Sequence, residues 1–252
     1  MSDVLESLRY SVDQLSSIIE PLSPEQLRTP AYPSEWTVAD VLSHLGSGAV
    51  IFVRTVESTV SGEPAPSDFN RSVWDEWDAK SPDAQAADLP AVDEAVVASL
   101  SKLSPKERAG FKVALGPFEM DFAAYAGLRL GEHALHTWDV AVTFDSDAVL
   151  PREVVDAILD GLLLLARFAA KPTGSTRTLV VQTDAPQMTY QIELAPESVT
   201  LSEGANDANV DVRMPAEAFI RLVYGRLDAA HTPAGITGTE HLDELRKVFP
   251  GF

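Results

Sequence analysis

Glu132 and His136 stand four residues apart in the segment Leu128–Asp139, whose apolar residues follow a helical pattern. That spacing places a carboxylate and an imidazole one turn apart on one face of a helix. Leu128 and Leu135 flank this face, so we expect the pair to point into a packed interior, where a Glu and a His need a compensating partner. A divalent metal offsets the burial of the carboxylate and accepts neutral imidazole as a ligand. The spacing therefore predicts two ligands of a metal site.

A third ligand has to come from another helix, and His44 is the candidate. A lone helical histidine is otherwise a partly buried residue with a hydrogen-bond partner. Together, His44, Glu132 and His136 match the ligand set of a catalytic zinc site, which leaves a fourth position for water or substrate. The zinc-protease fingerprint needs two histidines four apart beside a glutamate, whereas His133 and His136 are three apart. Proteolysis is therefore disfavoured.

Two aspartates are placed to orient these histidines. Asp40 precedes His44 by one helical turn, and Asp139 follows His136 by three residues. Each carboxylate could accept the outer ring N–H of its histidine and fix the tautomer and the orientation of the ring. A surface ion pair or a helix-end contact is the alternative role for each aspartate.

Segments of helical apolar spacing must position these residues, with apolar side chains at intervals of three and four. The predicted helices cover residues 2–20, 37–60, 91–103, 120–144 and 151–170, and the last is apolar on nearly all sides. The second begins with Thr37 as N-cap, and its two glycines, Gly46 and Gly48, lower its helix propensity. Residues 61–90 read as a long connector with a short helix near 70–80.

After Lys171 the pattern changes to short strands followed by helices. Strands are predicted at residues 178–182, 188–194, 198–201 and 210–213, and helices at 216–224 and 240–248. We expect an antiparallel sheet with helices on one face. The sequence therefore predicts two domains, a helical one over residues 1–171 and a smaller α+β one over residues 172–252.

Composition restricts the partners and the chemistry. Of the 252 residues, 38 are acidic and 19 are Lys or Arg, and the formal net charge of −19 disfavours binding to nucleic acid and to anionic membranes. No leader segment and no apolar stretch long enough to span a bilayer is recognisable, so we expect a cytoplasmic protein. The chain has no cysteine, so any thiol chemistry needs an external thiol.

Three segments resemble the mycothiol-dependent maleylpyruvate isomerase family. They are EWTVADVLSHL at residues 35–45, RLGEHALHTWD at 129–139 and VFPGF at 248–252. The resemblance implies a DinB-like four-helix bundle that holds a metal, most simply zinc, through His44, Glu132 and His136. It also implies a sterol-carrier-like α+β domain after residue 171 and an actinobacterial source.

The resemblance further implies an activity. In the isomerase, the thiol of mycothiol binds the metal as a thiolate and adds to the conjugated double bond of maleylpyruvate. Rotation about the resulting single bond and loss of the thiol give fumarylpyruvate. The family pattern places a Gly-Arg pair after a helix, so Arg226 would bind an anionic group of a dicarboxylate substrate; its alternative is a plain surface arginine.

Several functions remain open at this point. The protein could be an isomerase or a related thiol S-transferase that acts on a small electrophile. It could instead be a non-catalytic, metal-stabilised bundle whose second domain binds a hydrophobic ligand or a partner protein. A zinc-containing anti-sigma factor is disfavoured because those sites rely on cysteine. The oligomeric state is not predicted.

Overall fold

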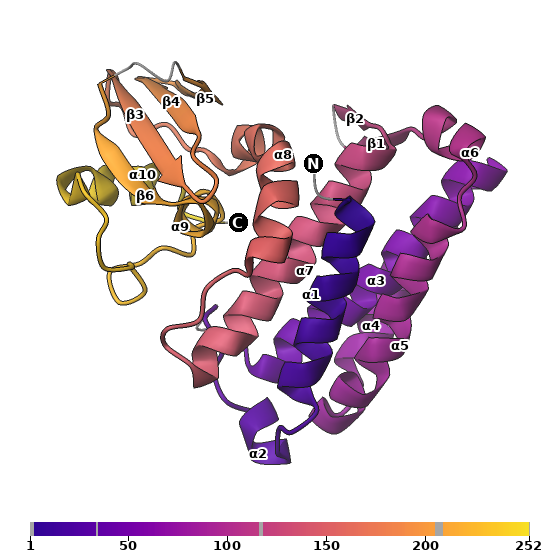
Figure 1. The fold of residues 1–252 in the computed structure, drawn as a ribbon. Coiled ribbons are helices and arrows are strands. Elements are labelled where there is room, and N and C mark those ends of the chain that lie inside the picture. Colours follow the sequence, from indigo (N-terminus) through magenta and orange to yellow (C-terminus); the bar gives the residue numbers. More distant parts are fainter. Residues whose placement is uncertain (1–2, 34, 116–117, 205–208, 252) are drawn as a thin grey trace. The chain divides into compact units, whose positions relative to one another are not determined.

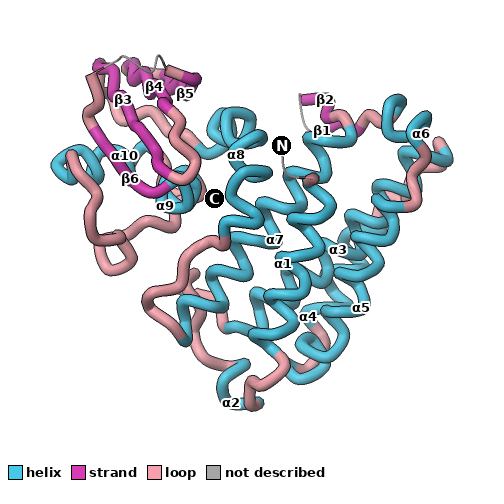
Figure 2. Tube along the Cα trace, in the orientation of Figure 1, coloured by secondary structure: helices cyan, strands magenta, loops and turns pink. Residues whose placement is uncertain are grey.

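The chain folds into two compact units, residues 1–148 and residues 149–252. The computed structural model describes residues 3–33, 35–115, 118–204 and 209–251. Ser2, at the predicted start of the first helix, and Phe252, at the end of the VFPGF segment, lie outside the described residues. Figure 2 shows a first unit that is almost entirely helical and a second that contains the larger sheet.

The first unit is built on four long helices, as predicted. They are α1 (Val4–Ile19), α3 (Val38–Ser61), α5 (Pro82–Ser101) and α7 (Phe122–Phe144). Helices α1 and α3 each pack against both α5 and α7, which closes a four-helix bundle (Figure 1). Burial follows the helical period: Leu8, Val12 and Leu15 of α1 all lie in the core.

Short elements connect these helices. They are α2 (Pro24–Leu27), α4 (Phe69–Asp78), α6 (Pro105–Gly110) and an antiparallel pair, β1 (Val113–Leu115) and β2 (Phe118–Met120). Helix α4 is the short helix expected near 70–80, and it brings Trp77 against Gly46 of α3. A Cβ atom at Gly46 would lie 2.2 Å from the Trp77 ring. Gly46 is therefore needed for this close packing, although it lowers helix propensity.

Helix α5 begins at Pro82, well before the start predicted at residue 91. Ser81 caps it by accepting a hydrogen bond from the Ala84 backbone N–H, and Pro82 occupies the first turn, where its missing N–H is harmless. Pro90 lies inside the helix. The sequence prediction placed Pro90 at the end of the connector, whereas packing against α1 and α3 maintains the helix through it.

The second unit contains a four-stranded sheet in the order β5-β4-β3-β6. Its elements are α8 (Arg152–Ala169), β3 (Arg177–Asp184), β4 (Thr189–Ala195), β5 (Ser198–Glu203), β6 (Val212–Pro215), α9 (Ala216–Val223), a 3-10 turn (Thr239–His241) and α10 (Leu242–Val248). Strands β3, β4 and β5 are antiparallel, as expected, but β6 pairs in parallel with β3. The sheet is therefore mixed, because the chain crosses from β5 to the opposite edge before β6.

Helix α8 belongs to this second unit, although the sequence assigned it to the bundle. It packs against α9 and β5. A helix that is apolar on nearly all sides gives no sign of which unit it joins, and the prediction placed the boundary at the change from helices to strands. The structural division falls before α8, at residues 148 and 149.

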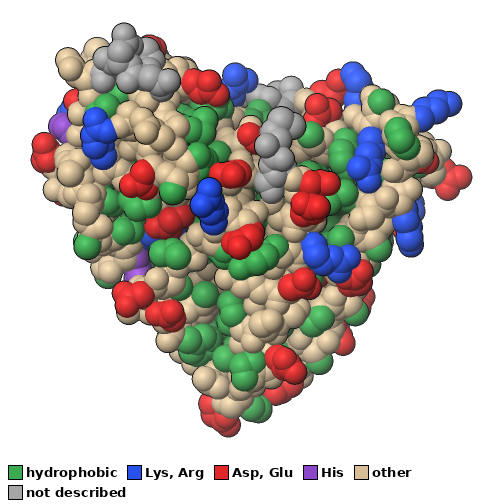
Figure 3. Space-filling view, in the orientation of Figure 1, with side chains coloured by type: hydrophobic (Ala, Val, Ile, Leu, Met, Phe, Trp, Pro, Cys, Tyr) green, Lys and Arg blue, Asp and Glu red, His purple; other side chains and the backbone are tan. Residues whose placement is uncertain are grey.

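Acidic side chains are numerous on the face drawn in Figure 3, with Lys and Arg side chains scattered among them. Within the part of the chain that the structure describes, no helix combines the length and the apolarity needed to cross a membrane.

Candidate metal centre

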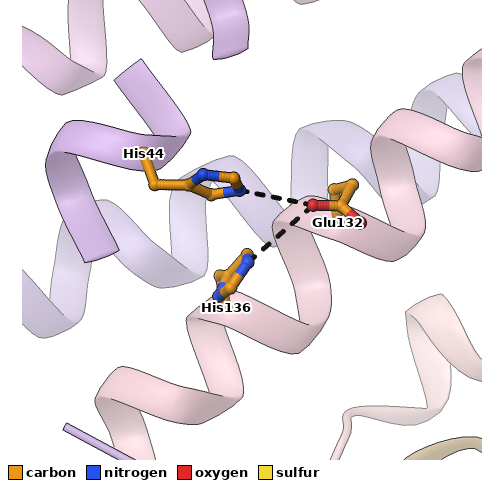
Figure 4. Close-up of side chains that lie close together, drawn as sticks. All are labelled: His44, Glu132 and His136. Atoms are coloured by element: carbon orange, nitrogen blue, oxygen red, sulfur yellow. Dashed lines mark hydrogen bonds and ion pairs between the residues drawn. The ribbon is translucent and has the colours of Figure 1, made fainter. Parts of the chain in front are cut away.

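Helices α3 and α7 bring His44, Glu132 and His136 together (Figure 4). Both helices begin with a side-chain cap. Thr37 and Asp40 form a capping box at the start of α3, and Asp121 accepts a hydrogen bond from the Ala124 backbone N–H at the start of α7. The two helices pack against each other, so His44 on α3 faces Glu132 and His136 on α7.

The potential ligand atoms of the three residues all lie within 4.8 Å of one another. Nε2 of His44 lies 3.4 Å from Oε2 of Glu132, and Nε2 of His136 lies 3.8 Å from the same oxygen. The two imidazole rings stand edge to face, with centroids 4.7 Å apart. Figure 4 shows the three side chains pointing toward one another.

The nitrogen–oxygen distances of 3.4 and 3.8 Å are longer than strong hydrogen bonds and close to the separation of two ligand atoms on one metal ion. Ligand bonds of about 2.0–2.2 Å in a tetrahedral site place the ligand atoms roughly 3.3–3.6 Å from one another. A strong N–H···O bond is shorter, at about 2.7–3.2 Å. Two imidazole nitrogens and one carboxylate oxygen are also the donors that zinc prefers, and three protein ligands leave a coordination position open.

The cluster is less buried than the sequence pattern predicts. The side chain of His136 is only 9% exposed, but those of His44 and Glu132 are 44% and 38% exposed. The prediction of a fully interior pair was therefore wrong for Glu132, which lies at the edge of the buried face of α7. His136 points inward, as predicted. The exposed side gives a small molecule access to the ligand atoms.

Asp139 and Trp36 hold the His136 ring in place. Nδ1 of His136 donates a hydrogen bond to Oδ2 of Asp139 at 2.8 Å, and Asp139 is fully buried. This contact fixes the tautomer in which Nε2 carries the free lone pair, directed toward Glu132. The Trp36 ring lies nearly parallel to His136, with centroids 6.0 Å apart, and 5.2 Å from His44. Trp36 is thus a neighbour of the site that the sequence analysis did not assign.

The other two predicted site residues have different surroundings. The carboxylate of Asp40 accepts hydrogen bonds from the backbone N–H and the hydroxyl of Thr37, at 2.8 and 2.7 Å. The structure therefore gives Asp40 the helix-end contact named as its alternative, in place of an interaction with His44. Arg226 lies in the second unit, where its Nη1 donates to the Tyr224 carbonyl at 2.9 Å.

A second polar cluster on α7 was missed by the sequence analysis. Asp93 of α5 bonds Nη2 of Arg129 at 2.8 Å and Nε2 of His133 at 3.1 Å, and all three are buried. Burial alone raises the pKa of the Asp93 carboxyl, but the adjacent His133 ring and Arg129 guanidinium outweigh it and hold that pKa below its usual range. The available signal was the position of Asp93 among the apolar residues of its helix.

The bundle resembles known proteins in sequence. A family model described as the mycothiol maleylpyruvate isomerase N-terminal domain matches residues 8–141, more than half of the chain. A protein of Geobacillus thermodenitrificans (strain NG80-2) whose name includes "metal-dependent hydrolase" is 34% identical over 83 residues, which are 32% of this chain and 44% of that protein. The match thus spans less than half the length of this relative.

Two crystal structures share the fold of about nine-tenths of the chain. A structure of the mycothiol-dependent maleylpyruvate isomerase aligns with a TM-score of 0.67 and 15% identity, over 93% of this chain and 91% of that chain. A histidine-to-alanine mutant of that enzyme aligns with a TM-score of 0.66 and 15% identity, over 89% and 88%. The matched family domain contains all three residues of the cluster, and the chain belongs to the mycothiol maleylpyruvate isomerase family.

Proposed function

We propose that this protein is a zinc-dependent enzyme that uses mycothiol, either to isomerise a maleylpyruvate-like dicarboxylate or to transfer the thiol to a small electrophile. The observation that carries the proposal is the convergence of His44, Glu132 and His136 in the bundle of a chain that belongs to this family. Its partners are small molecules rather than nucleic acid, and we expect it to act in the cytoplasm.

Each ligand residue has a defined role in this proposal. His44 and His136 would hold the metal through Nε2, and Glu132 would supply the negatively charged oxygen. Asp139 keeps the His136 ring oriented. A bound divalent metal lowers the pKa of a thiol at the open position, so that thiolate is present near neutral pH.

The thiol has to be external because the chain has no cysteine. Its sulfur forms a C–S bond to the conjugated double bond of the substrate, and the electron pair moves into the adjacent carbonyl. After rotation about the new single bond, the C–S bond breaks and the double bond re-forms, so the isomerisation consumes no reagent. Arg226 binds a substrate carboxylate in this scheme, since a guanidinium pairs with carboxylates in bidentate fashion.

A hydrolase is the second candidate. The name of the Geobacillus relative favours it, and an open coordination position also accepts water, whose pKa a metal lowers. The two candidates differ in one requirement, because hydrolysis needs no thiol.

The deciding experiment combines metal and thiol in four assays. Purified protein is stripped with a chelator and is then assayed on maleylpyruvate with zinc alone, with mycothiol alone, with both and with neither. We expect fumarylpyruvate only when both are present. Equal turnover without thiol would refute the thiol mechanism, and failure of the stripped protein to take up zinc would refute the metal site itself.

A further inference from the structure

Helix α7 carries two pairs of polar residues, and only one pair belongs to the metal centre. Glu132 and His136 form the ligand pair, whereas Arg129 and His133 form a pair with the same four-residue spacing. At 100° per residue, the two pairs lie about 60° apart around the helix. A rotation of α7 that displaced one pair would therefore displace the other.

The second pair is hydrogen-bonded to all three other long helices. Asp93 of α5 joins Arg129 to His133, as described above. Nη2 of Arg129 also donates to the Leu45 carbonyl of α3 at 3.1 Å. Ser11 of α1 is hydrogen-bonded to Nδ1 of His133 at 2.8 Å. These contacts fix both the rotation and the height of α7 within the bundle.

Their positions next to the metal ligands are informative. Leu45 directly follows His44, and His133 directly follows Glu132. Arg129 therefore ties the backbone of α3, beside one ligand, to the helix that carries the other two. Gly48 of α3 leaves room for this contact, because a Cβ there would lie 3.3 Å from Nη1 of Arg129.

A buried polar network contributes little net stability to a helix bundle. Buried ion pairs are often no more stabilising than apolar side chains of the same volume, and their best-attested use is to specify register. The Nε of Arg129 is in addition buried without a hydrogen-bond partner among the described residues. Register matters here because metal ligands must be held to within about 0.5 Å of their working geometry.

We propose that Asp93, Arg129 and His133 form a positioning network that sets the register of α7 against α3 and thereby places Glu132 and His136 opposite His44. The inference rests on the proposed metal site. Arg129 acts through the helices that carry the ligands and is a positioning residue.

The test measures zinc affinity by chelator competition and the visible spectrum of the Co²⁺-substituted protein. Arg129→Lys keeps the buried positive charge, but the shorter side chain lacks the Nη2 amino group that donates to both Asp93 and Leu45. We expect zinc binding at least about tenfold weaker than wild type and an altered Co²⁺ spectrum, as for other outer partners of metal ligands. A folded variant with wild-type affinity and spectrum would overturn the inference.

If Arg129→Lys does not fold, two glycine-to-alanine variants test the inference with a smaller perturbation of the bundle. In Gly48→Ala the added methyl group contacts the guanidinium of Arg129. In Gly127→Ala, on α7, the added methyl group has no neighbour within 4 Å. Both substitutions favour the helix, so both variants should fold. We expect weaker zinc binding in Gly48→Ala alone, and equal affinities would overturn the inference. Wild-type protein that takes up neither zinc nor Co²⁺ would instead refute the proposed metal site and the inference with it.

Discussion

Glu132 and His133 are consecutive residues of α7, yet they belong to clusters of opposite character. Around His133 the side chains are buried, and the contacts that Ser11, Asp93 and Arg129 make in this cluster lie between 2.8 and 3.1 Å. Around Glu132 the side chains of His44 and Glu132 are about 40% exposed, and the donor–acceptor distances are 3.4 and 3.8 Å. The first cluster has its partners within the protein, whereas the second presents its ligand atoms to something from outside. Distance and exposure therefore distinguish the buried imidazole of His133 from the exposed imidazole of His44, where residue type does not.

The largest effect is expected from breaking the closed cluster. Asp93→Asn leaves the Arg129 guanidinium buried without a countercharge, and removing one partner of a buried pair costs about 3–5 kcal/mol. Urea unfolding should show a loss of this size in the free energy of unfolding. The matched control is Glu94→Gln, the next residue, whose ion pair with Arg9 is exposed and should contribute less than about 1 kcal/mol. Equal losses in the two variants would contradict the comparison.

The pH dependence of the unfolding free energy tests the role of Asp93 in a second way. Its pKa is lower in the folded protein than in the unfolded chain. Its ionisation therefore stabilises the fold above the unfolded carboxyl pKa of about 3.9, and this contribution is lost as the pH falls through the folded pKa. Asp93→Asn should lack this component of the acid-induced loss of stability, which unfolding curves between pH 5 and pH 3 would reveal.

The next largest effect is expected in the open cluster and should be confined to metal binding. His44→Ala removes a half-exposed ligand, so we expect zinc affinity to fall by about 100-fold or more, roughly 2.7 kcal/mol, with the helical circular dichroism unchanged. His241→Ala, in the second unit, is the control and should bind zinc normally. Wild-type affinity in His44→Ala would exclude His44 as a ligand.

A smaller effect is expected from Asp139, which touches the metal centre only through His136. Asp139→Asn keeps the shape of the contact but removes its charge, and zinc affinity should fall by about tenfold. Chelator competition measures the change, and Asp147→Asn, an exposed site in the same unit, is the control. Unchanged affinity in Asp139→Asn would assign the buried aspartate a purely structural role.

The apolar spacing was sufficient to predict the long helices, because each of them buries a stripe that recurs every three or four residues. Their arrangement as a four-helix bundle was implied by the family resemblance. The spacing could not predict that α5 continues through Pro90, since that depends on packing against α1 and α3. Nor could it show that β6 would pair in parallel with β3, because strand order is set by contacts far apart in the sequence.

At the site, the four-residue spacing brought Glu132 and His136 together correctly, and Asp139 meets His136 as expected. The pattern could not decide whether Asp40 would bind His44 or Thr37, because both lie within its reach along the helix. The structure shows that it accepts a hydrogen bond from the backbone N–H of Thr37, which needs a partner at the helix start. Asp93 went unnoticed because its partners, Arg129 and His133, are about forty residues away along the chain.

The smallest expected effect extends the contrast to the second unit. Arg221 is fully buried and forms a two-point contact with the Glu217 carboxylate at 2.7 and 3.0 Å, whereas Arg226 is half-buried. If Arg226 binds a substrate carboxylate, Arg226→Ala should lower turnover by about tenfold, or roughly 1.4 kcal/mol, with unchanged zinc content and melting temperature. Arg226→Lys should recover only part of that loss, because an ammonium group lacks the planar fork.

Arg221→Ala should instead lower the melting temperature, as expected when one partner of a buried pair is removed. Wild-type kinetics in Arg226→Ala would leave the substrate carboxylate without this partner and reduce Arg226 to a surface residue.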